Sequence, residues 1–212
     1  MKPPNTRARG RPRQDAVHET EMRERIVTVA RELFLRDGVA AVSMRNIASE
    51  VGCSPMWLYR YFSNKQEILW QVWDVFLGEL FVRLEAVEAE TPRARLEQIA
   101  LAGLAYWLEY PERFCMVFLQ EDLVPDATRQ YVEGSAFVAR FDLITRIIEE
   151  AQAQGDLRGA TATEIAQGLL CLLQGLALNL ITISGYAWCE PERLARVAVG
   201  GYLAGLSGDQ FA

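Results

Sequence analysis

The chain has 212 residues, of which half are hydrophobic, and its 22 basic and 28 acidic side chains give a net charge of −6. A chain of this length can build its own core, which excludes the disordered, collagen-like and disulfide-rich classes. The four cysteines lie far apart without CxxC spacing, so the sequence predicts a reducing, cytoplasmic setting with no metal site and no cofactor.

Positive charge is concentrated at the start of the chain. Residues 1–65 hold 12 basic and 7 acidic side chains, a net of +5, although the whole chain is acidic. Arginines alternate here with glycine and proline, which disfavour a helix, and no apolar secretory segment follows. We expect residues 1–18 to form a basic flexible arm for a polyanionic partner, the alternative being a solvated tail that binds nothing.

Three short helices are expected over residues 19–66. Apolar residues at helical spacing predict a first helix of about twelve residues that ends before Gly38. Ser43 is positioned to cap a second helix that stops at Gly52, and Ser54 is positioned to cap a third. Two short helices joined by a tight turn with glycine predict a helix-turn-helix motif.

The third helix leaves several aromatic and basic side chains outside its expected core face. These are Pro55, Met56, Trp57, Tyr59, Arg60 and Tyr61. In a DNA major groove the tyrosine hydroxyls and Arg60 can reach phosphates, while Met56 and Trp57 can contact thymine methyl groups. For Trp57, packing against the next helix is an equal alternative.

Two motifs link this region to a known family. They are the run Ser43-Met-Arg-Asn-Ile-Ala and the segment LYRYFSNKQEIL, residues 58–69. Together they make the region from Ile26 to Leu69 resemble the DNA-binding domain of the TetR family of bacterial transcriptional regulators. The resemblance implies an all-α homodimer with an N-terminal three-helix DNA-binding domain and a C-terminal helical domain for ligand binding and dimerisation.

The same resemblance implies a function. The expected protein is a repressor of near-palindromic operator DNA that a small apolar or amphipathic ligand releases. The alternative is a regulator of the same fold that a protein partner controls, or that answers to no ligand.

Roles of single residues follow from matching positions in the family. Ser43 matches a residue that begins the second helix and touches a phosphate, and Arg45 matches one that can reach a base. Trp57 departs from the family, which often has a small residue there. The positions that match the sequence-reading front of the recognition helix are Ser54, Pro55 and Met56. The positions that match phosphate contacts are Tyr59, Arg60 and Tyr61.

Lys65 is a candidate phosphate contact on two grounds. The family has a lysine at the start of the fourth helix, and this chain has only two lysines, Lys2 and Lys65. Lys65 lies just inside an expected Asn64-x-x-Glu67 capping box, where the helix N-terminus favours an anion. The alternative is an exposed lysine without a partner.

The basic arm carries a second, weaker resemblance. Arg9-Gly10-Arg11-Pro12, extended by Arg13, resembles the core of an AT-hook. An extended Arg-Gly-Arg segment can lie along a narrow A·T-rich minor groove because glycine has no side chain to clash. The sequence therefore makes Arg9, Arg11 and Arg13 candidate DNA contacts beside the helix-turn-helix.

Residues 67–212 are expected to form the effector-binding and dimerisation domain. Helical spacing and breakers predict helices over residues 66–88, 96–108, 111–123, 125–154, 161–187 and 191–206, with no strand. Aromatic residues with one polar neighbour suggest a ligand pocket, although such residues are individually more typical of a core. The candidate ligand-binding residues are Trp73, Phe76, Tyr106, Trp107, Phe114, Phe118, Phe141 and Gln174.

A stretch of 25 residues between Glu164 and Glu190 contains no charged side chain. It is long enough to span a membrane, but its glutamines and glycines and the absence of flanking basic residues favour a helix buried in a protein interface. We expect it to pair with a symmetric copy together with the last helix. The candidate dimer-interface residues are Leu169, Leu172, Gly175, Leu176, Gly201 and Gly205.

An enzyme is the competing class of protein. The single histidine, His18, lies in a polar segment, and no P-loop, GxGxxG or GxSxG motif occurs. The sequence therefore predicts no catalytic residue and no enzymatic activity.

Overall fold

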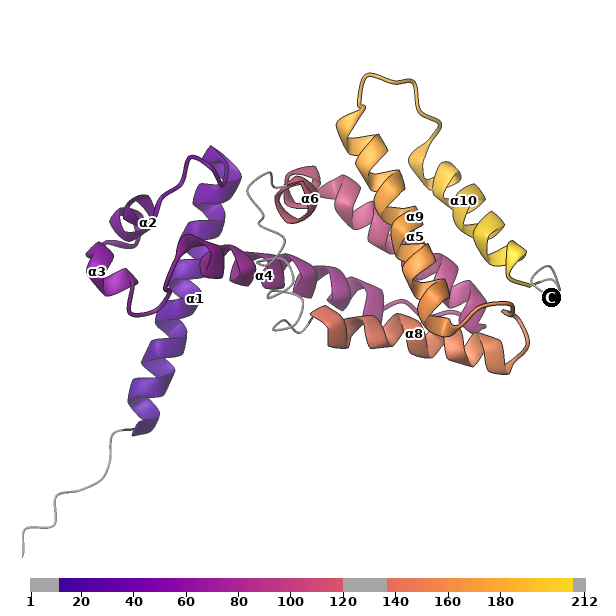
Figure 1. Ribbon diagram of the computed structural model, residues 1–212, viewed down its shortest axis with the longest axis horizontal. Coiled ribbons are helices and arrows are strands. Elements are labelled where there is room, and N and C mark those ends of the chain that lie inside the picture. The colour runs from indigo at the N-terminus through magenta and orange to yellow at the C-terminus, as the bar shows by residue number, and fades with distance from the viewer. Residues whose placement is uncertain (1–11, 120–136, 208–212) are drawn as a thin grey trace, which may run out of the picture. The chain divides into compact units, whose positions relative to one another are not determined.

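The computed structural model describes residues 12–119 and 137–207 (Figure 1). In this part of the chain every regular element is a helix, which confirms the all-α class. The helices are α1 (Pro12–Asp37), α2 (Met44–Val51), α3 (Pro55–Leu58), α4 (Lys65–Glu85), α5 (Pro92–Glu109), α6 (Pro111–Phe118), α8 (Phe137–Ala153), α9 (Ala162–Thr182) and α10 (Pro191–Gly205). The expected helices over 111–123 and 125–154 fall partly on residues 120–136, which lie outside the described residues.

Contacts divide the chain into two compact units, Met1–Trp73 and Asp74–Ala212. The division falls inside α4, seven residues beyond the boundary at residue 66 that the sequence suggested. One continuous helix therefore begins in the first unit and ends in the second.

α1 differs most from the sequence expectation. It spans 26 residues and begins at Pro12, where a flexible arm was expected to continue to residue 18. Proline is tolerated in a first helical turn because its missing N–H would have no partner there, so Pro12 begins the helix instead of preventing it. Arg13 therefore belongs to α1 and not to an extended arm. The helix ends before Gly38 as expected, and the φ of +82° at this glycine is a left-handed conformation that stops a helix.

α1, α2 and α3 enclose the apolar core of the first unit. The fully buried side chains include Ile26, Ala30, Phe34, Ile47, Ala48, Leu58 and Phe62. α1 and α2 supply most of them at helical spacing, while Leu58 and Phe62 face inward from α3 and the turn after it. This core holds the short α3 in place, since four residues are too few for a stable helix in water.

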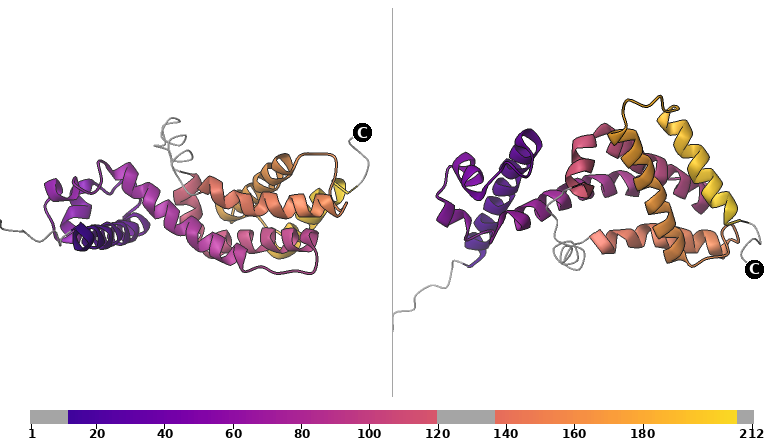
Figure 2. Two further views of the ribbon diagram at one scale, coloured as in Figure 1. Left: turned by 90° about the horizontal axis from the view of Figure 1, so that it is seen from below. Right: turned by 45° about the horizontal axis from the view of Figure 1, so that its top comes forward.

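α5 is the central helix of the second unit and contacts α6, α8, α9 and α10 (Figure 2). Thr91 caps it by accepting a hydrogen bond from the backbone N–H of Ala94 at 3.1 Å. Its fully buried Tyr106 donates its hydroxyl to the carbonyl of Phe76, 2.8 Å away, so the phenol is satisfied inside the core.

α9 contains most of the uncharged stretch, which follows Glu164 in its first turn, and the helix packs against α5, α8 and α10. A capping box between Thr161 and Glu164, a pattern visible in the sequence, begins the helix. Among the described helices, α9 alone is long and apolar enough to cross a membrane, with a mean hydropathy of 1.6, and only 22% of the qualifying window is buried. A large part of this apolar helix is therefore left uncovered by its own chain. Figure 1 shows α9 and α10 side by side as a hairpin.

Candidate nucleic-acid interface and ligand cavity

The turn between α2 and α3 has the geometry of a helix-turn-helix. Gly52 ends α2 with φ +80° and ψ 35°, and the Cys53 N–H donates to the carbonyl of Ala48 at 2.9 Å. Ser54 then caps α3, because its hydroxyl accepts from the backbone N–H of Trp57 at 3.2 Å. Pro55 follows in the first turn, so the chain enters α3 in the way that the sequence predicted.

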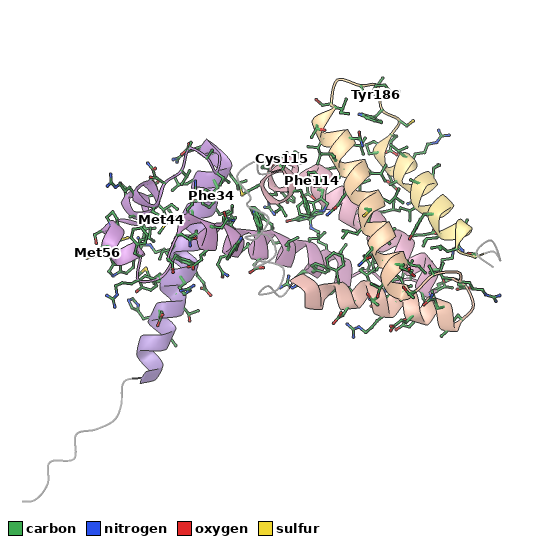
Figure 3. All side chains as sticks on the ribbon, in the orientation of Figure 1. Phe34, Met44, Met56, Phe114, Cys115 and Tyr186 are labelled. Carbon is green, nitrogen blue, oxygen red and sulfur yellow. The ribbon has the colours of Figure 1, made fainter. Side chains whose placement is uncertain are left out.

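The front of α3 is open to solvent. Met56 is 82% exposed and Tyr59 is 53% exposed, and Figure 3 shows Met56 at the outer side of the helix. Ser54, Pro55 and Arg60 are also exposed. An exposed group of a methionine, a tyrosine and an arginine is costly for a surface without a partner but suits base edges and phosphates.

Trp57 and Tyr61 are half-buried and do not project freely as the sequence suggested. Their ring centroids lie 4.6 Å apart at an interplanar angle of 48°. The two residues lie four apart, and the turn over residues 59–61 keeps nearly helical hydrogen bonds, so both side chains lie on the same side of this segment. Trp57 therefore packs on Tyr61 of its own segment and not on the next helix, and it lies beside a small hollow lined by Met22, Arg25, Val51, Gly52, Cys53 and Ser54.

Two arginines of α1 hold the motif, and the sequence reasoning did not assign them. Arg23 donates to the carbonyl of Tyr61 at 2.5 Å, and its guanidinium lies 4.4 Å from the ring centroid of Phe62. Arg25 donates to the carbonyl of Val51 at 3.0 Å, near the end of α2. The sequence shows only that both arginines lie in an acidic stretch, with acidic residues at helical spacing from them. That pattern fits a surface salt bridge equally well.

Lys65 is engaged inside its own domain. Its ammonium donates to the carbonyl of Val39 at 2.7 Å and is half-buried. The expected capping box is altered by one residue: Asn64 accepts from the Glu67 N–H, but the Glu67 carboxylate accepts from Ser63 instead of Asn64. Because an ammonium has three N–H donors, the contact with Val39 leaves two for a phosphate.

Ser43 and Arg45 differ in their availability. The Ser43 hydroxyl accepts from the Asn46 N–H at 3.2 Å and contacts the Asn46 carboxamide oxygen, so it mainly caps α2. Arg45 is exposed on the same helix. Arg9 and Arg11 of the expected arm lie outside the described residues.

The second unit contains an apolar cavity of about 80 Å³. Four of the eight candidate ligand residues line it, namely Trp107, Phe118, Phe141 and Gln174. The other four, Trp73, Phe76, Tyr106 and Phe114, are at most 2% exposed and do not line it. Their chemistry marked these residues as candidates in the sequence, but which side of each helix faces the cavity depends on how the helices pack.

Beside the cavity, an aromatic and charged network joins α4, α5 and α6. Trp107 and Phe118 have ring centroids 5.4 Å apart, and the ring centroid of Phe114 lies 4.9 Å from that of Phe118. Next to Phe114, the Arg113 guanidinium lies 3.9 Å from the ring centroid of Tyr110 and pairs with Glu79 on α4. These contacts connect one wall of the cavity to α4.

Glu109 has the largest described change in acidity among the carboxyl groups. Hydrogen bonds from Arg83, at 2.6 Å, and from Tyr110 lower the pKa of the Glu109 carboxyl from 4.5 to about 2. The Arg83–Glu109 pair lies at the surface, with side-chain exposures of 41% and 49%. It therefore contributes little to stability but reports whether α4 and α5 stay together.

The candidate interface residues fall in two groups. Leu169 is only 3% exposed and lines the cavity, so it belongs to the core of its own subunit and is unavailable to a second copy. Leu172, Gly175 and Leu176 are half-buried, and Gly201 and Gly205 are exposed. No atom lies within 4 Å of the position that a Cβ would take at Gly175, Gly201 or Gly205.

Gly168 serves a contact within the chain instead. A Cβ at this position would clash with the hydroxyl oxygen of Tyr202, which donates to the carbonyl of Ile165 at 3.0 Å. The glycine therefore allows α10 to approach α9 closely.

Within the described ranges no cluster of histidine, cysteine and carboxylate side chains could hold a metal ion. The four cysteines are free thiols, and burial raises the pKa of Cys53 and of Cys115.

Comparison with known proteins gives one family match. Residues 26–72 match the family described as bacterial regulatory proteins, tetR family. The uncharacterized HTH-type transcriptional regulator YerO of Bacillus subtilis (strain 168) is 26% identical over 110 residues, or 50% of this chain. The match spans 38% of the length of that curated relative.

Two solved structures are similar over most of the chain. The TetR family transcriptional regulator PfmR from Thermus thermophilus is 26% identical, with a TM-score of 0.57, and the match covers 88% of this chain and 96% of that one. A protein of unknown function from Rhodococcus sp. RHA1 is also 26% identical, with a TM-score of 0.73 and the same coverage. The likeness therefore extends through the helical second unit.

Proposed function

We propose that this chain, whose helix-turn-helix domain is that of the TetR family of transcriptional regulators, is a homodimeric repressor that a small apolar or amphipathic ligand releases from its operator. It is a DNA-binding regulator and not an enzyme. The observation that carries the proposal is the exposed front of α3, held by a capped turn on a closed apolar core. Its place of action would be the cytoplasm, where bacterial operator DNA lies.

The proposed DNA contacts divide by chemistry. Met56 and the exposed start of α3 would face base edges, and Arg45 on α2 would reach a base from the side. Tyr59, Arg60 and Tyr61 would contact phosphates, with Ser43 and Lys65 at two helix N-termini. Trp57 would support Tyr61 through their ring contact, 4.6 Å between centroids, and would shape the surface without reading a base itself.

The homodimer would form through α9 and α10. Apolar side chains on the hairpin remain exposed, including Leu178 at 39%, Ile183 at 49% and Val197 at 68%. Open space at Gly175, Gly201 and Gly205 would allow a symmetric copy to approach the backbone closely. A four-helix interface of this kind buries α9 on the side that its own chain leaves uncovered, and it sets the distance between two recognition helices on a near-palindromic site.

Release by a ligand would act through α4. This helix begins beside the DNA-binding motif at Lys65 and continues into the second unit, where Leu77, Leu80 and Leu84 line the cavity. A ligand can shift the protein only by binding one conformation better than another. The favoured conformation would be one in which the two recognition helices no longer fit successive major grooves.

Selection of bound DNA from a random pool, followed by a screen for compounds that release it, tests this proposal. The full-length protein should enrich a near-palindromic sequence. Arg45→Ala should change that sequence, whereas Tyr59→Phe should weaken binding equally on selected and random DNA. A pool without enrichment would contradict the DNA-binding role. Enrichment without any releasing compound would favour the alternative regulator, controlled by a protein partner or by no ligand.

A further inference from the structure

The cavity of the second unit has one chemical feature that limits what it can hold. Of its sixteen lining residues in the described part of the chain, fifteen are apolar and the sixteenth is Gln174. Apolar walls favour a hydrocarbon ligand, while a single polar group in such a wall fixes orientation.

Gln174 is a half-buried side chain of α9, and it makes no hydrogen bond within the described residues. Its carboxamide has two N–H donors and one carbonyl acceptor. Its carboxamide atoms are not fully buried, so they can exchange a hydrogen bond with water for one with a ligand that enters the cavity.

Charged ligands find no counter-ion among these lining residues. Arg140 is a described cation near one lining residue, since its guanidinium lies 5.8 Å from the ring centroid of Phe81 and close to Gly78. It is not one of the residues that line the cavity. Among the described lining residues, a carboxylate or an ammonium would meet no opposite charge, which is unfavourable for a charge in apolar surroundings.

On the basis of the proposed function, we propose that the ligand is an uncharged, mainly apolar molecule. Its one hydrogen-bonding group, such as a hydroxyl or an amide, pairs with Gln174. The cavity volume of about 80 Å³ favours a compact molecule. The same chemistry makes fatty-acid anions and organic cations poor ligands for this site.

Binding of 1-hexanol, hexanoate and hexylammonium to the full-length protein tests the class of ligand, because the three probes share one chain length and differ in charge. Isothermal titration should show that the alcohol binds at least about tenfold more tightly than either ion. Tighter binding of hexanoate or hexylammonium, or no binding of the alcohol, would overturn the proposal.

Variants at Gln174 test the pairing. Gln174→Leu should weaken hexanol binding by about tenfold, because the hydroxyl then loses its partner. Gln174→Glu should reverse the preference toward hexylammonium, and Gln167→Glu, an exposed position on the same helix, should change neither affinity. Equal hexanol affinity in Gln174→Leu and the unaltered protein would contradict the assigned role.

Operator release, measured with the same three probes, separates this inference from the proposed function. Binding of hexanol without release would contradict ligand control and leave the assignment of the cavity intact. Release by a charged probe that binds more tightly would support ligand control and overturn the assigned ligand class.

Discussion

Lys65, at the start of α4, donates a hydrogen bond within the DNA-binding domain. Its ammonium lies 2.7 Å from the carbonyl of Val39, in the loop that leads to α2. We expect Lys65→Ala to lower the free energy of unfolding by about 1.5 kcal/mol, because a half-buried charge-assisted hydrogen bond is lost. We also expect the slope of log affinity against log salt to fall by about one, because a phosphate contact is lost.

Urea unfolding and DNA titration at several salt concentrations measure the two effects. Arg36→Ala serves as the control, because it removes an exposed cation of the same domain that pairs only with Asp37 among the described residues. An unchanged salt slope in Lys65→Ala would mean that this lysine only holds the Val39 loop.

Glu109 offers a test of the surface contact between α4 and α5 by pH. Its carboxyl pKa is lowered from 4.5 to about 2, so the folded state favours the ionised form. The stabilisation is present above about pH 4.5 and is lost as the pH falls through about 2. Carbon-13 NMR of the carboxyl group should show the lowered pKa, and Arg83→Gln should raise it toward 4.5. A Glu109 carboxyl that titrates at its ordinary pKa in the unaltered protein would rule out the pair in solution.

The turn between α2 and α3 is the element that depends most on one backbone conformation. Gly52 has a φ of +80° and open space around the position of a Cβ. A side chain there meets no clash, so the cost of Gly52→Ala is purely conformational, about 1 to 2 kcal/mol. Gly52→Asn should cost less, because asparagine tolerates the left-handed region. Urea unfolding of both variants checks this order, and equal losses would contradict a conformational origin.

At the level of elements, the sequence predicted the features that depend on residues close together in the chain. The caps at Ser43, Ser54 and Thr161 were predictable because the cap and its partner N–H lie within three residues. The early start of α1 and the single turn of α3 were not predicted. Helix propensity alone predicts that Pro12 breaks a helix. The end of α3 depends on the core in which Leu58 and Phe62 are buried.

The whole molecule depends on the proposed contact between two copies of α9 and α10. Gly175→Arg should place an unpaired charge in that contact and weaken the dimer by about a hundredfold or more. Gln154→Arg is the matched control, since it adds the same charge at an exposed position just beyond the end of α8. Sedimentation should show monomers for the first variant and dimers for the second. An intact Gly175→Arg dimer with full operator affinity would place the interface elsewhere.

A truncation that ends just before α1 tests whether the N-terminal arm contributes to DNA binding. Removing residues 1–11 deletes four basic side chains, Lys2, Arg7, Arg9 and Arg11, and leaves α1 complete. Affinity should fall most for operators with A·T-rich flanks, where a narrow minor groove attracts arginine. Equal losses on A·T-rich and G·C-rich flanks would show that the arm contributes only diffuse charge.

The sequence by itself determined the helical class, the capped helix-turn-helix and the family resemblance, because these depend on periodicity and on short-range spacing. Only the tertiary structure decided the direction in which each apolar side chain points. Leu169 was predicted to face a second copy, yet it lines the cavity, and the neighbouring Gly168 admits Tyr202 of the same chain. A helix that is apolar nearly all round has no preferred face in its sequence, and its faces are assigned only when neighbouring helices pack against it.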